Sequence, residues 1–197
     1  MSFSTFVEQR RTIYHLGSSI PISEKSIEQL VEHAVKHTPS AFNSQSARVI
    51  VLFGDAHNTL WSLTKENLRA IVPAEKFSPT EDKINSFGSG AGTVLFFEDQ
   101  SVVEYLMTNF VQYAHNFPIW SQQSSGMLQY VVWTGLANIN IGASLQHYNE
   151  VIESDVAEAF DVPSTWKLIA QMPFGSIETP AGDKQFNPIE DRFRVLR

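Results

Sequence analysis

The spacing of apolar and polar residues predicts a chain of helices interrupted by short buried strands. The clearest helix covers residues 22–36, because its apolar residues recur three and four positions apart, on one helix face. Ser23 is placed to cap this helix, and Pro39 ends it. Runs of β-branched and aromatic residues predict three buried strands, at residues 48–53, 93–97 and 166–172.

The remaining pattern completes a single α+β domain over residues 1–197. Further helices are predicted at residues 3–10, 55–72, 79–87, 101–113, 119–138 and 154–160, with a loop at 142–148. Residues 175–197 contain Pro180 and Pro188 and are expected to form an extended tail. Its apolar residues, such as Phe186 and Phe193, need cover, and a partner subunit is one solution.

Composition removes several classes of function. The net charge is −7, from 14 basic and 21 acidic residues, which disfavours nucleic acid and an anionic membrane surface as partners. The chain has no cysteine, so thiolate nucleophiles, disulfides and iron–sulfur clusters are excluded. No secretory signal or membrane-spanning run is recognisable, and a cytoplasmic protein is expected.

Cations near both ends of the chain are candidates for binding a phosphate. Arg10 and Arg11 precede Thr12, and a guanidinium pair beside a hydroxyl offers charge-assisted hydrogen bonds to an anion. Lys184 in the tail could add a mobile charge. Taken alone, each of these residues also fits an ordinary solvated surface position.

Two loops could receive a flat ligand. Ser40, Asn43 and Gln45 lie between the best helix and the first strand, and amides match the donor and acceptor edge of a flavin ring or nucleobase. The segment 142–148, Gly-Ala-Ser-Leu-Gln-His-Tyr, has small residues that allow close approach of a ring. A plain polar loop and a tight turn are the alternatives.

A metal site and a protein nucleophile have little support. His33 and His37 lie four positions apart on one helix, but no third ligand follows from the spacing. The glycine-rich segment 88–92 leads into a strand, whereas a dinucleotide-binding loop leads from a strand into a helix. No nucleophile-elbow motif is present.

The order of these motifs resembles the FMN-dependent nitroreductase family over essentially the whole chain. The loop 142–148 is closest to the short branch that includes yeast-type and lactic-bacterial members. The resemblance implies a nitroreductase-like α+β fold with a small, mostly antiparallel sheet surrounded by helices. It further implies a homodimer with two FMN sites at the interface and a C-terminal arm, residues 175–197, that wraps the partner.

The implied activity is that of an NAD(P)H oxidoreductase, a flavoprotein that reduces nitroaromatics, quinones or similar small electrophiles. NADH or NADPH would donate electrons in a ping-pong cycle, with hydride transfer through flavin N5, and no catalytic side chain or metal is required. By motif, Arg10, Arg11 and Lys184 would hold the FMN phosphate, with Thr12 in place of the usual serine. Ser40, Asn43 and Gln45 would bind the ribityl chain and ring edge, and Ala143, Ser144 and Leu145 would line the ring near N5.

The substrate pocket is expected at Phe42, Tyr113 and Phe117, in a part of the chain rich in aromatic residues, for which the hydrophobic core and a dimer interface are equal alternatives. Two departures from the family pattern concern charge: Tyr14 stands where many relatives carry a cation near the flavin N1–O2 edge, and Phe186 stands where many carry arginine. These departures leave open an alternative, a flavin-binding regulatory or stress-response protein with little turnover. A structural dimer without flavin is the third possibility, supported only by His33 and His37.

Overall fold

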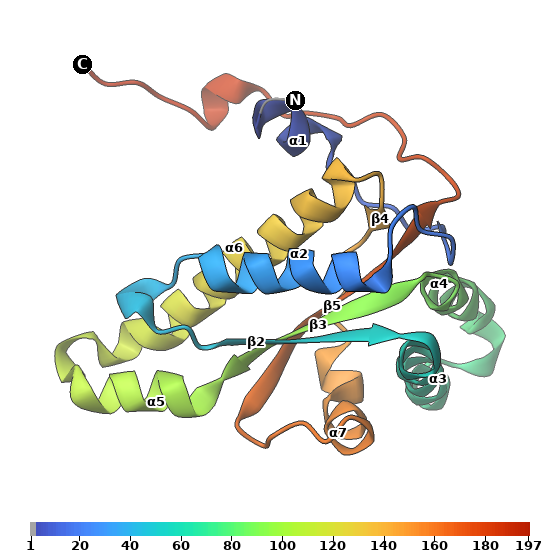
Figure 1. Cartoon of the computed structure of the whole chain (residues 1–197), viewed down its shortest axis with the longest axis horizontal. Helices are drawn as coiled ribbons and strands as arrows, with labels where there is room; N and C mark the ends of the chain where they lie inside the picture. Colours follow the sequence, from blue (N-terminus) through green and yellow to red (C-terminus); the bar gives the residue numbers. More distant parts are fainter. Residues whose placement is uncertain (1–2) are drawn as a thin grey trace.

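The structure is a computed structural model that describes residues 3–197; residues 1 and 2 lie outside it. Figure 1 shows a sheet seen nearly edge-on, with helices on both sides. The α-helices are α1 (Phe3–Gln9), α2 (Glu24–His37), α3 (Gly54–Ile71), α4 (Ser78–Gly88), α5 (Gln100–Asn109), α6 (Phe117–Asn138) and α7 (Asn149–Ala159). Short 3-10 helices span η1 (Ala41–Asn43), η2 (Ala74–Lys76), η3 (Val111–Asn116) and η4 (Ile189–Asp191).

The strands form a five-stranded sheet of the order β1-β5-β3-β2, with β4 added to β5. They are β1 (Leu16–Gly17), β2 (Ala47–Phe53), β3 (Gly92–Asp99), β4 (Gly142–Ala143) and β5 (Trp166–Ile177). All four strand pairings are antiparallel. The α+β, mostly antiparallel architecture predicted from the sequence is therefore confirmed.

Helices cover both faces of the sheet, which explains why the central strands are apolar without interruption. Val94 and Phe96 of β3 pack with α2 and α6, whereas Leu95 and Phe97 point to the opposite face, against α3, α4 and α7. Every residue of β3 is buried. Neighbouring side chains of a strand point to opposite faces, so a strand covered on both sides has no polar alternation.

Several boundaries differ from the sequence prediction for local reasons. Helix α7 begins at Asn149, five residues earlier than expected, because Asn149 and Glu153 bond to the edge of β5. Pro118 opens α6 instead of ending the preceding helix, since proline is tolerated in the first turn. The helix expected at 101–113 ends at Asn109 and continues as η3. No helix within residues 3–197 has the length and apolarity to cross a membrane.

The C-terminal tail begins later than predicted, because β5 continues to Ile177 and pairs with β1 and β4. From Glu178 onward the residues are mostly exposed, and Figure 1 shows the chain running away from the sheet towards its C-terminus. Phe186, Phe193 and Leu196 are exposed to 74%, 64% and 93%. This much apolar surface agrees with a tail that is covered by something outside the single chain.

Candidate functional site

The segment that carries Ser40, Asn43 and Gln45 has an unusual backbone. Phe42, Asn43 and Gln45 have positive φ angles of 58°, 50° and 49°. For non-glycine residues this left-handed region costs about 1 kcal/mol or more each, and such strain persists only where the surroundings enforce it. Strained backbone is concentrated at functional sites, so this segment is a candidate on structural grounds as well as by motif.

Hydrogen bonds hold the strained segment from inside and from the neighbouring strand. Ser40 Oγ accepts a bond of 2.9 Å from the backbone N–H of Gln45. Arg48 donates through Nη1 to the carbonyl of Gln45 at 2.8 Å and forms an ion pair with Asp99 at 2.9 Å. The backbone of Ser40–Gln45 is thus fixed before any ligand arrives.

A buried carboxyl group lies under the same segment. Ser46 Oγ donates to Glu98 Oε2 at 2.5 Å, and Glu98 is completely buried. Burial raises the pKa of Glu98, against the hydrogen bond from Ser46 and the charge of Arg48, which both lower it. The second oxygen, Oε1, is buried without a hydrogen-bond partner. Glu98 therefore keeps its proton to a higher pH in the folded protein than in the unfolded chain.

The predicted substrate residues belong to one aromatic cluster centred on Phe42. Its ring centroid lies 5.0 Å from Phe110, 5.2 Å from Phe117 and 5.9 Å from Tyr113, and it stacks on Trp120 at 6.0 Å. Phe42 and Tyr113 are 50% and 41% exposed, whereas Phe117 is buried at 2%. Phe42 and Tyr113 can meet a ligand, and Phe117 supports them from below.

The second loop, at residues 142–145, lies beside the N-terminal arginines. Thr12 forms a parallel bridge with Ala143, and the N–H of Ile13 donates to the carbonyl of Ala143 at 3.0 Å. Gly142 permits this contact, since a Cβ there would lie 3.1 Å from the Cβ of Ile13. Two stretches that are some 130 positions apart in the sequence are thus one structural unit.

Within this loop the side chains face inward. Ala143 and Ser144 are buried to 1% and 0% exposure, and Ser144 Oγ accepts a bond from the side chain of Gln146. Leu145 is half-buried and packs against the core of α2 and α6. The chain therefore offers mainly backbone and the Leu145 side chain to a ligand here, which suits a flat ring better than a strongly charged group.

The three cations predicted to bind phosphate have different environments. The guanidinium of Arg10 stacks on Trp133, 4.3 Å from the ring centroid, and its Nε is buried without a partner. Arg11 donates to the carbonyl of Gly182 at 2.5 Å and so holds the start of the tail. Lys184 follows two positions later and is exposed, with its Nζ 5.2 Å from the Phe186 ring.

One cation near Tyr14 was not predicted. Lys83 of α4 has its Nζ 5.6 Å from the Tyr14 ring and 5.9 Å from the Phe87 ring. Tyr14 is half exposed. No sequence signal distinguishes Lys83 from other charges of its helix, and only the packing of α4 against the segment after Thr12 brings it here.

The two parts of the candidate site do not meet within one chain. Phe42 contacts Trp120 near the start of α6, whereas Arg10 contacts Trp133 near its end. An α-helix rises about 1.5 Å per residue, so these two contacts are roughly 20 Å apart along α6. Figure 1 shows η1 and α5 at one end of this helix and α1 and β4 at the other. A single chain therefore presents two half-sites.

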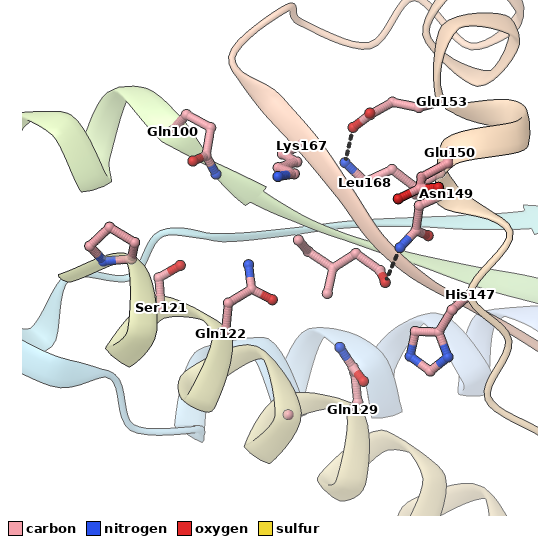
Figure 2. Close-up of a pocket in the computed structure, with 13 residues that line it drawn as sticks. Gln100, Ser121, Gln122, Gln129, His147, Asn149, Glu150, Glu153, Lys167 and Leu168 are labelled. Atoms are coloured by element: carbon pink, nitrogen blue, oxygen red, sulfur yellow. Dashed lines mark hydrogen bonds between the residues drawn. The ribbon is translucent and has the colours of Figure 1, made fainter. Parts of the chain in front are cut away.

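Between the half-sites a polar groove of about 780 Å³ runs along α6 (Figure 2). Side chains of α6 lie on one side, and those of α7 and β5 on the other. Asn149 donates to the carbonyl of Ile169 at 2.8 Å, and Glu153 accepts from the N–H of Leu168 at 2.8 Å. These bonds satisfy the backbone groups of Leu168 and Ile169 on the outer edge of β5, so this wall of the groove does not expose an unpaired strand edge.

His33 and His37, the weakly supported metal candidates, lie close together without a third ligand among the described residues. The rings of His33 and His37 are 4.4 Å apart on α2. Within residues 3–197 no group of three or more His, Asp or Glu side chains is arranged to hold a metal ion. The flavin-free alternative, a structural dimer built around this pair, gains nothing from the geometry.

With the fold and the two half-sites described, comparison with known proteins identifies the class. The sequence model of the nitroreductase family matches residues 7–176, so the chain belongs to the nitroreductase family. Membership of this family supports an oxidoreductase activity, as the sequence predicted.

Individual relatives match most or all of the chain. Nitroreductase CinD from Lactococcus lactis, solved with nicotinic acid, is 44% identical, with a TM-score of 0.93 and full coverage of both chains. It has also been solved with chloramphenicol and with 4-nitrophenol. Nitroreductase FRM2 from Saccharomyces cerevisiae is 34% identical over 172 residues, 86% of this chain and 84% of its own. These two relatives match the two groups that the resemblance named.

A more distant structure bears on the fold alone. A nitroreductase-like protein from Exiguobacterium sibiricum, solved in complex with FMN, is 15% identical, with a TM-score of 0.73. It covers 100% of this chain and 98% of its own.

Proposed function

We propose that the chain is an FMN-dependent NAD(P)H oxidoreductase that reduces nitroaromatics, quinones or similar small electrophiles by a ping-pong cycle. One observation carries the proposal: the arginines at 10 and 11 are joined, through the pairing of Thr12 with Ala143, to a loop that offers backbone to a flat ring. Cations beside such a surface match a ligand with a phosphate at one end and an aromatic ring at the other.

The residues present fit FMN. Arg10, Arg11, Thr12 and Lys184 would hold the phosphate, and the buried Nε of Arg10, which has no partner, fits a site completed by an anion. Ala143, Ser144 and Leu145 would lie along the ring. When bound, FMN supplies hydride transfer at N5, which is why no protein acid, base or nucleophile is needed.

The other half of each site would come from a second copy of the chain. Ser40, Asn43 and Gln45 lie on the opposite end of α6 from Arg10, so one chain cannot supply both halves to one flavin. A homodimer through α6 agrees with the exposure of Met127, Tyr130 and Val131, at 43%, 37% and 44%. The groove of Figure 2 flanks this face. The tail, with its exposed apolar residues, would wrap the partner.

The flavin of this chain keeps a cation at its ring edge despite the Tyr14 departure. Lys83 lies over the Tyr14 ring and would supply the charge that the family pattern otherwise places at position 14. A cation near N1 and O2 stabilises the anionic reduced ring by Coulomb attraction. This weakens the case for the regulatory alternative, because one of its two supports was the missing charge.

The acceptor would bind against Phe42 and Tyr113. Both rings are exposed, both come from the half-site that the second copy contributes, and aromatic rings stack well on flat aromatic acceptors. CinD, at 44% identity, binds nicotinic acid and 4-nitrophenol, which are flat aromatic molecules.

The test begins with the absorbance spectrum of the purified protein under anaerobic conditions. The proposal expects oxidised flavin bands that bleach on addition of NADH or NADPH and return when a nitroaromatic or quinone is added. A flavin that binds but is not reduced by either nucleotide would contradict the proposed activity and favour the regulatory alternative. A protein that binds no added FMN would refute both.

A matched pair of variants tests the phosphate assignment. Arg10→Ala should weaken FMN binding, measured by flavin fluorescence. Arg69→Ala serves as the control, because Arg69 also stacks on an aromatic ring, that of Phe77, but lies on α3 and pairs with Glu81. Equal effects of the two changes would contradict the assignment.

A further inference from the structure

Trp133 contacts both sequence stretches that form the phosphate end of the candidate site. Its ring lies under the guanidinium of Arg10, with 4.3 Å from the ring centroid to the guanidinium carbon. Its Nε1–H donates to the carbonyl of Ala143 at 3.2 Å. Neither contact follows from a motif, because Trp133 lies within a long apolar helix, near its end, and looks there like a core residue.

The stack orients the arginine. A guanidinium is planar, and all of its N–H donors lie in that plane, so an aromatic ring against its face leaves the donor edge free for an oxyanion. An unstacked arginine must lose side-chain freedom when it binds a phosphate, whereas a stacked one has lost part of it already. Trp133 therefore prepares Arg10 for a bidentate contact.

The hydrogen bond from Trp133 fixes the position of α6 relative to the loop at residues 142–145 and to the segment after Arg10. The carbonyl of Ala143 accepts from the backbone N–H of Ile13 at 3.0 Å and from Trp133 at 3.2 Å. One carbonyl oxygen has two lone pairs, so both are used. The helix α6 is thereby tied to the loop and to the segment that follows Arg10, at a single point.

We propose that Trp133 is the positioning residue for the flavin phosphate: it holds the Arg10 guanidinium edge-on to the phosphate and so makes the site select FMN over flavins that lack a phosphate. The proposal rests on the proposed function, since it takes FMN as the ligand. It adds to that function a role for Trp133 and a preference for FMN over riboflavin, neither of which follows from a sequence motif.

The readout is a ratio of two affinities. FMN and riboflavin share the same ring and differ at the phosphate, so a change that only loosens the protein weakens both alike. The ordering of the Arg10 side chain that Trp133 would spare corresponds to roughly a two- to twelve-fold change in binding. Trp133→Leu should raise the Kd for FMN by that factor and change the Kd for riboflavin by less than about two-fold. Both are measured by titrating flavin-free dimer and following flavin fluorescence.

A second tryptophan supplies the matched control. Trp166 also lies against an arginine, with the Arg48 guanidinium carbon 5.8 Å from its ring centroid, but Arg48 bonds to Gln45 in the ring-edge half-site. Trp166→Leu should therefore alter the two affinities in equal proportion. An equal effect on both flavins from Trp133→Leu as well would overturn the proposal and leave Trp133 a packing residue.

Two further variants keep the test decisive if Trp133→Leu does not fold. Trp133→Phe retains the stack and should keep the FMN-to-riboflavin ratio within about two-fold of the wild type. Arg10→Lys removes the planar guanidinium and should lower the ratio as Trp133→Leu does. A wild-type ratio in Arg10→Lys would overturn the proposal. If the unmodified protein binds neither flavin, the proposed function fails, which is a different result from any change in the ratio.

Discussion

A buried hydroxyl joins two helices, α3 and α4, to the sheet, and its removal should be among the costliest single changes in this protein. Thr93 Oγ1 accepts a bond of 2.9 Å from Nε1 of Trp61 and lies 2.9 Å from Nδ1 of His57, whose Nε2 lies 3.1 Å from the carbonyl of Gly88. A carbonyl can only accept, so Nε2 carries the proton, Nδ1 is an acceptor, and Thr93 donates to it. Thr93, His57 and Trp61 are 0%, 2% and 3% exposed.

Thr93→Val keeps the shape and the β-branch but removes the hydroxyl. The N–H of Trp61 and Nδ1 of His57 are then buried without a partner. An unsatisfied buried polar group costs about 1–3 kcal/mol, so the free energy of unfolding should fall by about 2–4 kcal/mol. For a domain of this size that corresponds to a fall in Tm of roughly 5–15 °C.

The assay is denaturant unfolding followed by tryptophan fluorescence, at fixed protein and FMN concentrations because partner and ligand binding both shift apparent stability. Thr93→Ser is the matched control: it keeps the hydroxyl and loses one methyl group, worth about 1 kcal/mol. A loss of stability in Thr93→Val no larger than in Thr93→Ser would refute the hydrogen-bond argument, because the hydroxyl would then contribute less than the methyl.

Three further predictions concern charge. Burial raises the pKa of Glu98 above 4.5, so above that pH the unfolded state releases a proton that the folded state still holds, and the free energy of unfolding falls as the pH rises. Glu98→Gln should flatten this decline. At pH 8 the variant should unfold at a higher denaturant concentration than the wild type, but at pH 4 it should not. Burial lowers the pKa of His57 below 6.5, so stability falls as the pH drops through 6.5, and a His57→Gln variant whose stability fell equally steeply there would contradict the assignment. Lys83→Met should lower the midpoint potential of the bound flavin in a dye-coupled titration, and an unchanged potential would exclude Lys83 from the ring edge.

Strands and helices with strong local patterns were predicted well from the sequence. The predicted strand 48–53 is β2, Ala47–Phe53, because its β-branched residues leave few alternatives. Helix 22–36 is α2, where Ser23 Oγ accepts from the N–H of Ser26 as a cap should. Boundaries failed where tertiary contacts decide, as at Asn149, whose side chain bonds to β5 rather than to its own helix.

Recognition of the site from sequence had a similar limit. Arg10, Thr12 and the loop after Gly142 were found because their spacing is a pattern, and the structure brings them together. Trp133 and Lys83 belong to no pattern: each is one residue of a helix, and its neighbour in space lies far away in the chain. Contacts of this kind depend on how α6 and α4 pack, which no local propensity encodes.

The length of α6 explains why the spacing of the motifs lists the candidate residues but does not by itself say how many chains one site needs; only the resemblance implied two. The aromatic cluster lies at the start of this helix and Arg10 at its end, so the order of motifs along the chain is the same whether they meet within one copy or between two. In the proposed dimer, a two-fold axis across the middle of α6 reverses the second helix and brings the start of one helix to the end of the other. Gly126, near that middle, has open space where its Cβ would be, which leaves room for close approach of a second helix. Because the two-fold axis relates both ends of α6 in one copy to both ends in the other, a single α6–α6 contact would complete both sites at once.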